Sequence, residues 1–229
     1  MYITHLELAT KDLHAQKEFY AKILELPVEL SANRLEVKAG ATALVFVPAA
    51  SDFEGAYHFA FNIPENQIRA AKEWLSTKVD LLRDENRLDE FDFSNWNAHS
   101  IYFKDAAGNI LEFIARHDLK NTVQGGFAGS QVLNVSEIGL PSEDVIAFAK
   151  EICSQLNLSV FRGEPGETFT PVGDGNGLLI LPIVNRIWYP NTGVPARLLP
   201  IRVQGESNGR EWEIRGVPYR IISLNPSTL

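Results

Sequence analysis

The apolar and polar positions of the chain follow one pattern twice. Residues 5–13 and 137–145 both read as a short strand, a Thr or Ser at a helix cap (Thr10 and Ser142) and an acidic first turn. Apolar residues at helical spacing follow each stretch, and the apolar run 44–48 recurs as 178–182. The two copies lie 132 residues apart in the first case and 134 in the second, which indicates that the chain is duplicated.

Each half divides again into smaller modules. Residues 1–118 contain two β-α-β-β-β modules, the second with a strand at 57–63, a helix at 64–78 and closing strands at 100–103 and 109–114. Residues 132–229 contain a third module and a shortened fourth, whose strands at 197–203, 211–215 and 219–224 leave no room for a helix.

This pattern predicts an α+β fold in which four modules pair into two curved, barrel-like sheets. The Gly-rich stretch 124–130 marks the boundary between the halves. We therefore expect a metal-binding module pair over 1–120, a linker over 121–131, and a degenerate module pair without metal ligands over 132–229.

Composition and charge exclude several classes of protein. Apolar residues make up 45% of the 229 positions and charged residues 22%, which is typical of a folded globular chain. The net charge of −8, with no basic run, argues against nucleic acid and against an anionic membrane surface. The single cysteine, Cys153, allows neither an intramolecular disulfide nor a zinc site built from cysteines. We expect a cytoplasmic protein without a signal peptide or spanning helix, a monomer or homodimer, whose partner is a small molecule.

Strand parity selects three candidate metal ligands. Because successive side chains of a strand point to opposite faces, His5, His58 and Glu112 all lie opposite their apolar neighbours. Two imidazoles and one carboxylate on a shared concave face form a triad that holds Fe(II) or a similar ion with open coordination positions. Spacing alone leaves open the alternative that all three are ordinary core or surface side chains.

A family signature lies in the last strands of the second module. Residues 101–112 read Ile-Tyr-Phe-Lys-Asp-Ala-Ala-Gly-Asn-Ile-Leu-Glu, which resembles the vicinal-oxygen-chelate signature Tyr-Phe-x-Asp-Pro-x-Gly-Asn-x-x-Glu. This superfamily includes glyoxalases, extradiol dioxygenases and bleomycin-resistance proteins. Ala106 replaces the usual Pro, and Gly108 with Asn109 still supplies a turn. The opening strand and helix, residues 5–20, resemble the superfamily's first module, and 132–229 resemble it through the repeat.

The resemblance implies that His5, His58 and Glu112 hold one divalent metal ion, with Fe(II) favoured and Mn(II) or Zn(II) as the other options. The layout is similar to that of extradiol dioxygenases, in which a tyrosine lies ten residues before the glutamate ligand. Tyr102 stands at that position. It is predicted to be a catalytic residue that hydrogen-bonds bound substrate, and the alternative is a tyrosine that only lines the barrel.

Three further residues are weaker candidates for support of the ligands or contact with substrate, namely Glu7, Ser100 and His99.

The predicted function is a divalent-metal-dependent enzyme, with extradiol ring cleavage of a small catechol-like chelator as the first choice. The family's acid–base histidine is missing, because residues 38–57 contain no His. The apolar strand 44–47 also lacks the glutamate that is the fourth ligand of glyoxalase I. An isomerase, epimerase or lyase on the same triad is the alternative, and a non-catalytic, resistance-type binding protein is another.

The second half does not repeat the triad. His5 aligns with Glu137, His58 falls near Leu198, and Glu112 falls near Arg220. These residue types cannot bind the same metal, so we expect an ion pair between Glu137 and Arg220 in its place.

Overall fold

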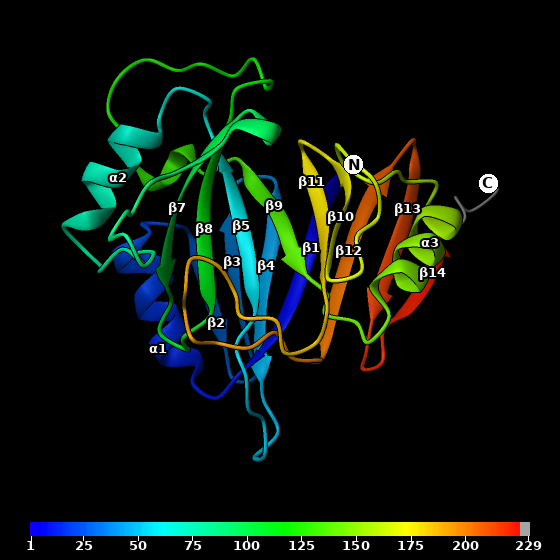
Figure 1. The fold of residues 1–229 in the computed structure, drawn as a ribbon. Helices are drawn as coiled ribbons and strands as arrows, with labels where there is room; N and C mark the ends of the chain where they lie inside the picture. The colour runs from blue at the N-terminus through cyan, green and yellow to red at the C-terminus, as the bar shows by residue number, and fades with distance from the viewer. Residues whose placement is uncertain (225–229) are drawn as a thin grey trace.

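The computed structural model describes residues 1–224, which form two seven-stranded sheets packed against each other (Figure 1). The first sheet has the order β14-β13-β12-β1-β4-β3-β2 and the second β10-β11-β9-β5-β8-β7-β6. This confirms the α+β fold with two curved sheets.

The strands of the first sheet are β1 (Tyr2–Thr10), β2 (Val28–Ser31), β3 (Arg34–Ala39), β4 (Thr42–Pro48), β12 (Ile201–Ser207), β13 (Arg210–Arg215) and β14 (Arg220–Leu224). Those of the second are β5 (His58–Ile63), β6 (Phe91–Phe93), β7 (Ala98–Lys104), β8 (Ile110–Arg116), β9 (Asn134–Gly139), β10 (Phe169–Asp174) and β11 (Gly177–Pro182). The helices are α1 (Leu13–Glu18), which continues as the π-helical turn η1 (Phe19–Ile23), α2 (Ile68–Ser76) and α3 (Val145–Leu156), with 3₁₀ turns η2 (Ser94–Trp96) and η3 (Gly129–Gln131).

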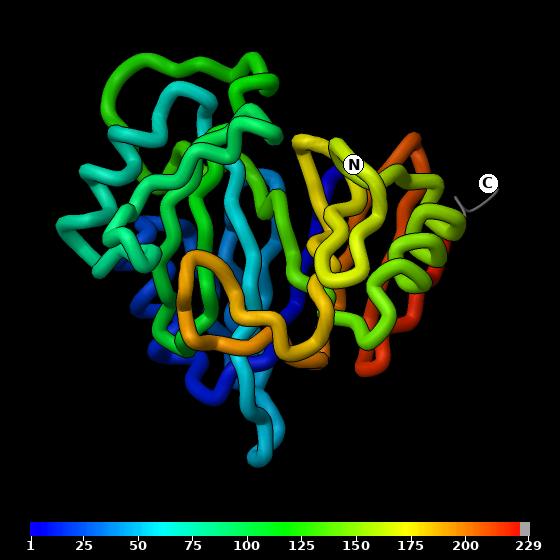
Figure 2. Tube along the Cα trace, in the orientation of Figure 1, coloured from blue at the N-terminus to red at the C-terminus, as the bar shows by residue number. Residues whose placement is uncertain are grey.

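Each sheet combines modules from both halves of the chain. In the first sheet β1 of the first module pairs with β12 of the fourth, and in the second sheet β5 of the second module pairs with β9 of the third. Both junctions are antiparallel. The Cα trace shows the same mixing, with blue beside orange and red in one sheet and cyan beside green and yellow in the other (Figure 2). The sheets therefore cross the sequence boundary at 121–131.

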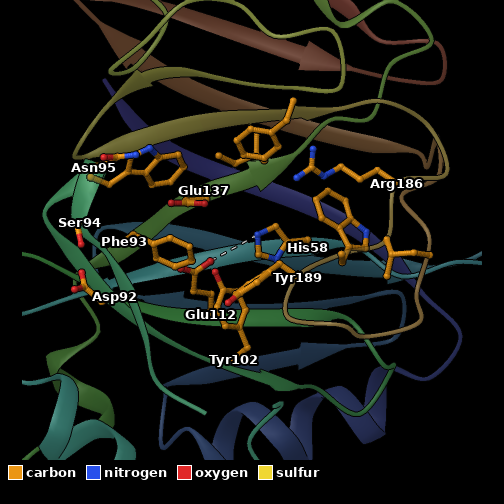
Figure 3. A pocket seen from close by; sticks show the side chains of 15 residues that line it. His58, Asp92, Phe93, Ser94, Asn95, Tyr102, Glu112, Glu137, Arg186 and Tyr189 are labelled. Carbon is orange, nitrogen blue, oxygen red and sulfur yellow. Dashed lines mark ion pairs between the residues drawn. The ribbon is translucent and has the colours of Figure 1, made fainter. Parts of the chain in front are cut away.

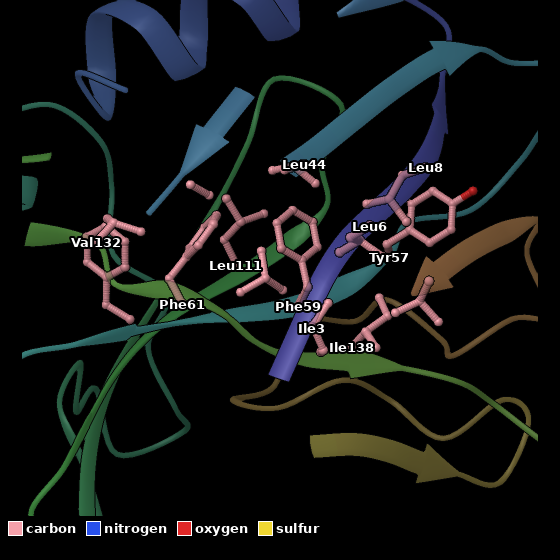
Figure 4. Packing of buried hydrophobic residues seen from close by; sticks show 14 of the residues in the cluster. Ile3, Leu6, Leu8, Leu44, Tyr57, Phe59, Phe61, Leu111, Val132 and Ile138 are labelled. Atoms are coloured by element: carbon pink, nitrogen blue, oxygen red, sulfur yellow. The ribbon is translucent and has the colours of Figure 1, made fainter. Parts of the chain in front are cut away.

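The core lies between the inner faces of the two sheets. Leu6 and Leu8 of β1 belong to one buried cluster with Phe59 and Phe61 of β5 (Figure 4). Because side chains alternate along a strand, this packing directs His5 and His58 to the outer faces of their sheets. Every residue of β5 is nonetheless buried, since a further segment covers its outer face.

Aspartates cap the two helices that follow β1 and β9, where the sequence predicted Thr10 and Ser142. Asp12 precedes α1, and its carboxylate accepts the N–H groups of His14 and Ala15, each at 2.9 Å. Asp144 accepts the N–H of Ala147 before α3. Each Asp is the residue directly before the first helical turn, where a side-chain oxygen reaches the free N–H groups.

The covering segment, residues 183–200, links β11 to β12 without a helix and is called the strap here. It runs across the outer face of the second sheet (orange in Figure 2). Backbone hydrogen bonds join its two arms, from Ala196 N–H to the Arg186 carbonyl at 2.8 Å and from Trp188 N–H to the Val194 carbonyl at 2.9 Å. Among residues 1–224, no helix has the length and apolar character needed to cross a bilayer.

Candidate metal centre

Three strands in the middle of the second sheet bring three ligand-type side chains together. His58 on β5, Glu112 on β8 and Glu137 on β9 place one ligand atom each within 4.8 Å of the others (Figure 3). His58 Nε2 lies 3.7 Å from Glu112 Oε2. Ala60 stands opposite both Glu112 and Glu137 in the strand register, so only a methyl group lies between the two carboxylates.

Burial gives this group unusual protonation. Burial, and then the neighbouring charge of Glu137, raises the pKa of Glu112 to about 8. Burial also raises the pKa of Glu137, against the opposing effect of Arg116. The His58 ring has its pKa lowered to about 4 by burial, so it is neutral at neutral pH. Two ionised carboxylates this close in a buried site would repel each other, and a cation between them would offset that cost.

His58 is oriented as a ligand. Its Nδ1 lies 3.1 Å from the Ile110 carbonyl oxygen, which requires the ring proton on Nδ1 and leaves the Nε2 lone pair directed toward Glu112. A hydrogen bond from the far ring nitrogen to a backbone carbonyl is the usual support of a metal-binding histidine. One imidazole and two carboxylates therefore fit a divalent cation.

Arg116 is the ion-pair partner of Glu137. Its guanidinium forms a buried ion pair with Glu137 Oε1, and its Nε donates to Asn62 Oδ1 at 3.2 Å. The predicted pair between Glu137 and Arg220 is not formed. Arg220 begins β14 in the other sheet, because β9 pairs with β5 and β11 rather than with a strand of the fourth module.

The structure does not bring His5 to His58 and Glu112. His5 lies on β1 in the first sheet, where its Nε2 is 3.9 Å from Glu7 Oε2 and Arg34 pairs with Glu7 at 3.2 Å. Val45 faces Glu7 from β4, at the register position that Glu112 holds on β8. The outer face of the first sheet thus repeats the imidazole but has no carboxylate at the position equivalent to Glu112.

Tyr102 and Ser100 lie beside the three-residue group. Tyr102 stands directly opposite Glu112, and burial together with the Glu112 and Glu137 charges raises the pKa of its hydroxyl well above the ordinary value. The hydroxyl therefore remains a donor. Ser100 is two residues away on the same face and fully buried. His99 points to the opposite face, where its Nδ1 lies 2.8 Å from Nε2 of His117.

A cavity of about 560 Å³ opens above the group. Strap residues form one wall: the Trp188 ring centre lies 4.9 Å from that of His58, and the Tyr189 ring 5.6 Å from that of Tyr102. The sequence left the place of Trp188 and Tyr189 open. The signal in the sequence for this wall was an aromatic pair in a segment that has neither strand nor helix periodicity.

Gly139 on β9 makes room for this wall. A Cβ atom there would lie 2.5 Å from Trp188 Cη2. Gly139→Ala is expected to lower the free energy of unfolding by about 1–3 kcal/mol and to expose Trp188, because overpacking forces the indole away from His58. Gly126→Ala is the matched control, since nothing lies within 4 Å of its Cβ position. Urea unfolding and acrylamide quenching of tryptophan fluorescence measure both effects, and equal values for the two variants would contradict the packing.

The fold of this chain is similar to those of several solved structures. A candidate dioxygenase from Bacillus subtilis superimposes with a TM-score of 0.59 at 18% identity, over 80% of this chain and 64% of that one. Glyoxalase I from Zea mays superimposes with a TM-score of 0.53 at 13% identity, over 79% and 66%. The chain has the vicinal-oxygen-chelate fold.

The vicinal-oxygen-chelate fold agrees with the signature at 101–112, which forms β7, a turn and β8 and supplies Glu112. The chain spans less than two thirds of the length of either of these two proteins. No family model matches the sequence, and no curated protein matches it.

Proposed function

We propose that this chain is a divalent-metal-dependent enzyme that acts on a small, oxygen-chelating molecule, with the metal held by His58, Glu112 and Glu137. The observation that carries the proposal is the buried group itself, which lies at the floor of the 560 Å³ cavity. A cavity of this size suits a small organic ligand.

The donor set supports Fe(II), Mn(II) or Zn(II), all of which accept mixed imidazole and carboxylate ligation. Such an ion, when bound, supplies Lewis-acid chemistry, and iron can also supply redox chemistry. The chain's own residues orient the ligands, donate a hydrogen bond to substrate and exclude water. The Ile110 carbonyl fixes the His58 ring, Arg116 fixes Glu137, the protonated Tyr102 hydroxyl is placed to donate to a substrate oxygen, and the strap shields the floor from water.

Extradiol-type cleavage of a catechol-like substrate is the first reaction we propose. The position of Tyr102, the aromatic walls of the cavity and the fold shared with a candidate dioxygenase support it.

The second candidate reaction is that of an isomerase, epimerase or lyase on the same three ligands. Within residues 1–224, His58 is the only histidine lining the cavity, so no other imidazole there can serve as the acid–base group. Oxygen uptake with catechols separates the two reactions.

Metal content provides the first test. Wild type loaded anaerobically with Fe(II), Mn(II) or Zn(II) is expected to retain about one equivalent after desalting. His58→Ala and Glu137→Gln are expected to weaken binding by about 100-fold or more, because each removes a direct ligand. Elemental analysis and titration calorimetry measure the loss.

His5→Ala is the matched control, since it removes an imidazole at the equivalent position of the other sheet. It should leave the metal content unchanged. An empty wild type would overturn the metal site. Loss of metal from His5→Ala with retention in Glu137→Gln would restore the triad expected from sequence.

A further inference from the structure

Two carboxyl groups lie at the inner end of the cavity, whereas one position at its mouth is cationic. Within the described part of the chain, Arg186 is the only lysine or arginine that lines the cavity. We infer that Arg186 is a specificity-determining residue that binds an anionic substituent, such as a carboxylate, on a planar aromatic substrate. This inference rests on the proposed function and names the substrate class of the same site.

Most N–H donors of the Arg186 guanidinium have no acceptor within residues 1–224. Its only side-chain hydrogen bond within residues 1–224 runs from Nη1 to the Thr168 carbonyl at 3.4 Å, and the side chain forms no ion pair there. The guanidinium carbon lies 4.9 Å from the Phe169 ring centre, so the group lies over an aromatic face. A guanidinium carries five N–H donors in a fixed fork that matches a carboxylate, and most of these donors remain open.

The backbone of Arg186 is also fixed. The hydrogen bond from Ala196 N–H to its carbonyl joins the two arms of the strap, and Ile187 and Pro195 form a bridge beside it. A cation on an ordered hairpin loses little backbone entropy when it binds an anion, which favours a recognition role.

The walls favour a planar, apolar body for the ligand. Phe93, Trp96, Phe169, Trp188 and Tyr189 line the cavity. Ile187 and Tyr189 are 47% and 46% exposed, which is unusual for side chains of this size, and both lie on the strap beside Arg186. An aromatic ligand would cover these surfaces.

The charged side chains that line the cavity would orient a bound substrate. Glu112 and Glu137 lie at the floor, and Asp92 lies on the side opposite Arg186, as Figure 3 shows. An anionic substituent is attracted to the Arg186 side, while the chelating oxygens lie over His58, Glu112 and Glu137. Metal binding and Arg186 would thus select two different ends of one substrate.

The test compares two probes on zinc-loaded protein, because zinc supports no redox turnover. Titration calorimetry measures the affinity of catechol and of 3,4-dihydroxybenzoate for wild type, Arg186→Gln, Arg186→Lys and the control Arg210→Gln, an exposed arginine in β13. Wild type is expected to bind the carboxylated probe about tenfold more tightly, as one charge-assisted contact provides. The preference should fall below about twofold in Arg186→Gln, survive in part in Arg186→Lys and remain in Arg210→Gln.

Three outcomes would overturn parts of this account, and they can be told apart. Equal affinity of wild type for the two probes, or a preference that survives Arg186→Gln, contradicts the role of Arg186 and leaves the metal site intact. Failure of zinc-loaded protein to bind either probe contradicts the substrate class. Failure to bind zinc contradicts the proposed function itself.

Discussion

Replacing Arg116 by Met is expected to lower the free energy of unfolding of the metal-free protein by about 3–5 kcal/mol, because it leaves the Glu137 carboxyl buried without its partner, so that it is either charged and unpaired or must take up a proton on folding. The Arg116 and Glu137 side chains are only 2% and 3% exposed. The guanidinium also lies over the Trp96 and Phe161 rings, 5.6 and 5.8 Å from their centres, and methionine removes that contact together with the charge while keeping an apolar side chain of similar length. Urea unfolding in the presence of a chelator measures it and removes any contribution from bound metal.

A double-mutant cycle separates the pair from its surroundings. Arg116→Met combined with Glu137→Gln is expected to be less destabilising than Arg116→Met alone, since no uncompensated charge remains. Arg162→Met is the matched control: Arg162 pairs with Asp118 and also lies over Phe161, but its side chain is 38% exposed. That control should lose no more than about 1 kcal/mol. Additive losses in the cycle would contradict a coupled buried pair.

The pair also shows what the sequence could and could not predict. Strand parity correctly placed His58 and Glu112 opposite their apolar neighbours, because alternation is a local property. The repeat aligned Glu137 with His5 of the first module. What remained hidden was the choice of partner module, since β1 and β5 carry the same pattern and either could pair with β9.

That choice decides the composition of the candidate site. When β9 pairs with β5, Glu137 enters the group of His58 and Glu112, and His5 moves to the other sheet. Pairing between strands of different modules depends on how whole sheet faces pack together, and the sequence of a single strand does not determine it. The strap could not be predicted for a related reason: its aromatic residues follow neither the strand nor the helix period.

Replacing Asp105 by Ala is the second variant for which we expect a large loss, of about 3 kcal/mol in the free energy of unfolding. Asp105 is the aspartate of the signature, in the turn between β7 and β8. Its Oδ1 accepts the N–H groups of Ala107 and Asn109 at 2.9 and 3.0 Å. Its Oδ2 accepts hydrogen bonds from Gln16, Tyr20 and Asn109 at 2.7, 3.2 and 2.8 Å.

These five donors come from two modules. Gln16 and Tyr20 belong to α1 and η1 of the first module, whereas the turn belongs to the second, so Asp105 ties the two sheets together. Removing the carboxylate leaves buried donors without an acceptor, which costs more than the hydrogen bonds themselves contribute. The signature aspartate therefore has a structural role, distinct from that of Glu112 at its end.

Asp105→Asn provides a sharper comparison than alanine alone. An asparagine oxygen can keep the two backbone N–H groups, but its NH₂ then faces three donors. Gln16 can relieve part of this conflict by turning its amide, because its Oε1 is buried and has no partner within residues 1–224. We expect a loss between those of wild type and Asp105→Ala, and a larger loss when Gln16→Leu removes that relief.

Asp84→Ala serves as the control, since Asp84 accepts two backbone N–H groups in a more open turn, at 3.0 and 2.8 Å. We expect it to lose no more than about 1 kcal/mol. If Asp105→Ala were no worse than Asp84→Ala, the hydrogen bonds of Asp105 would add nothing to the junction between the modules. A loss near 3 kcal/mol would instead assign the signature turn to the junction between modules, where it positions β8 and with it Glu112.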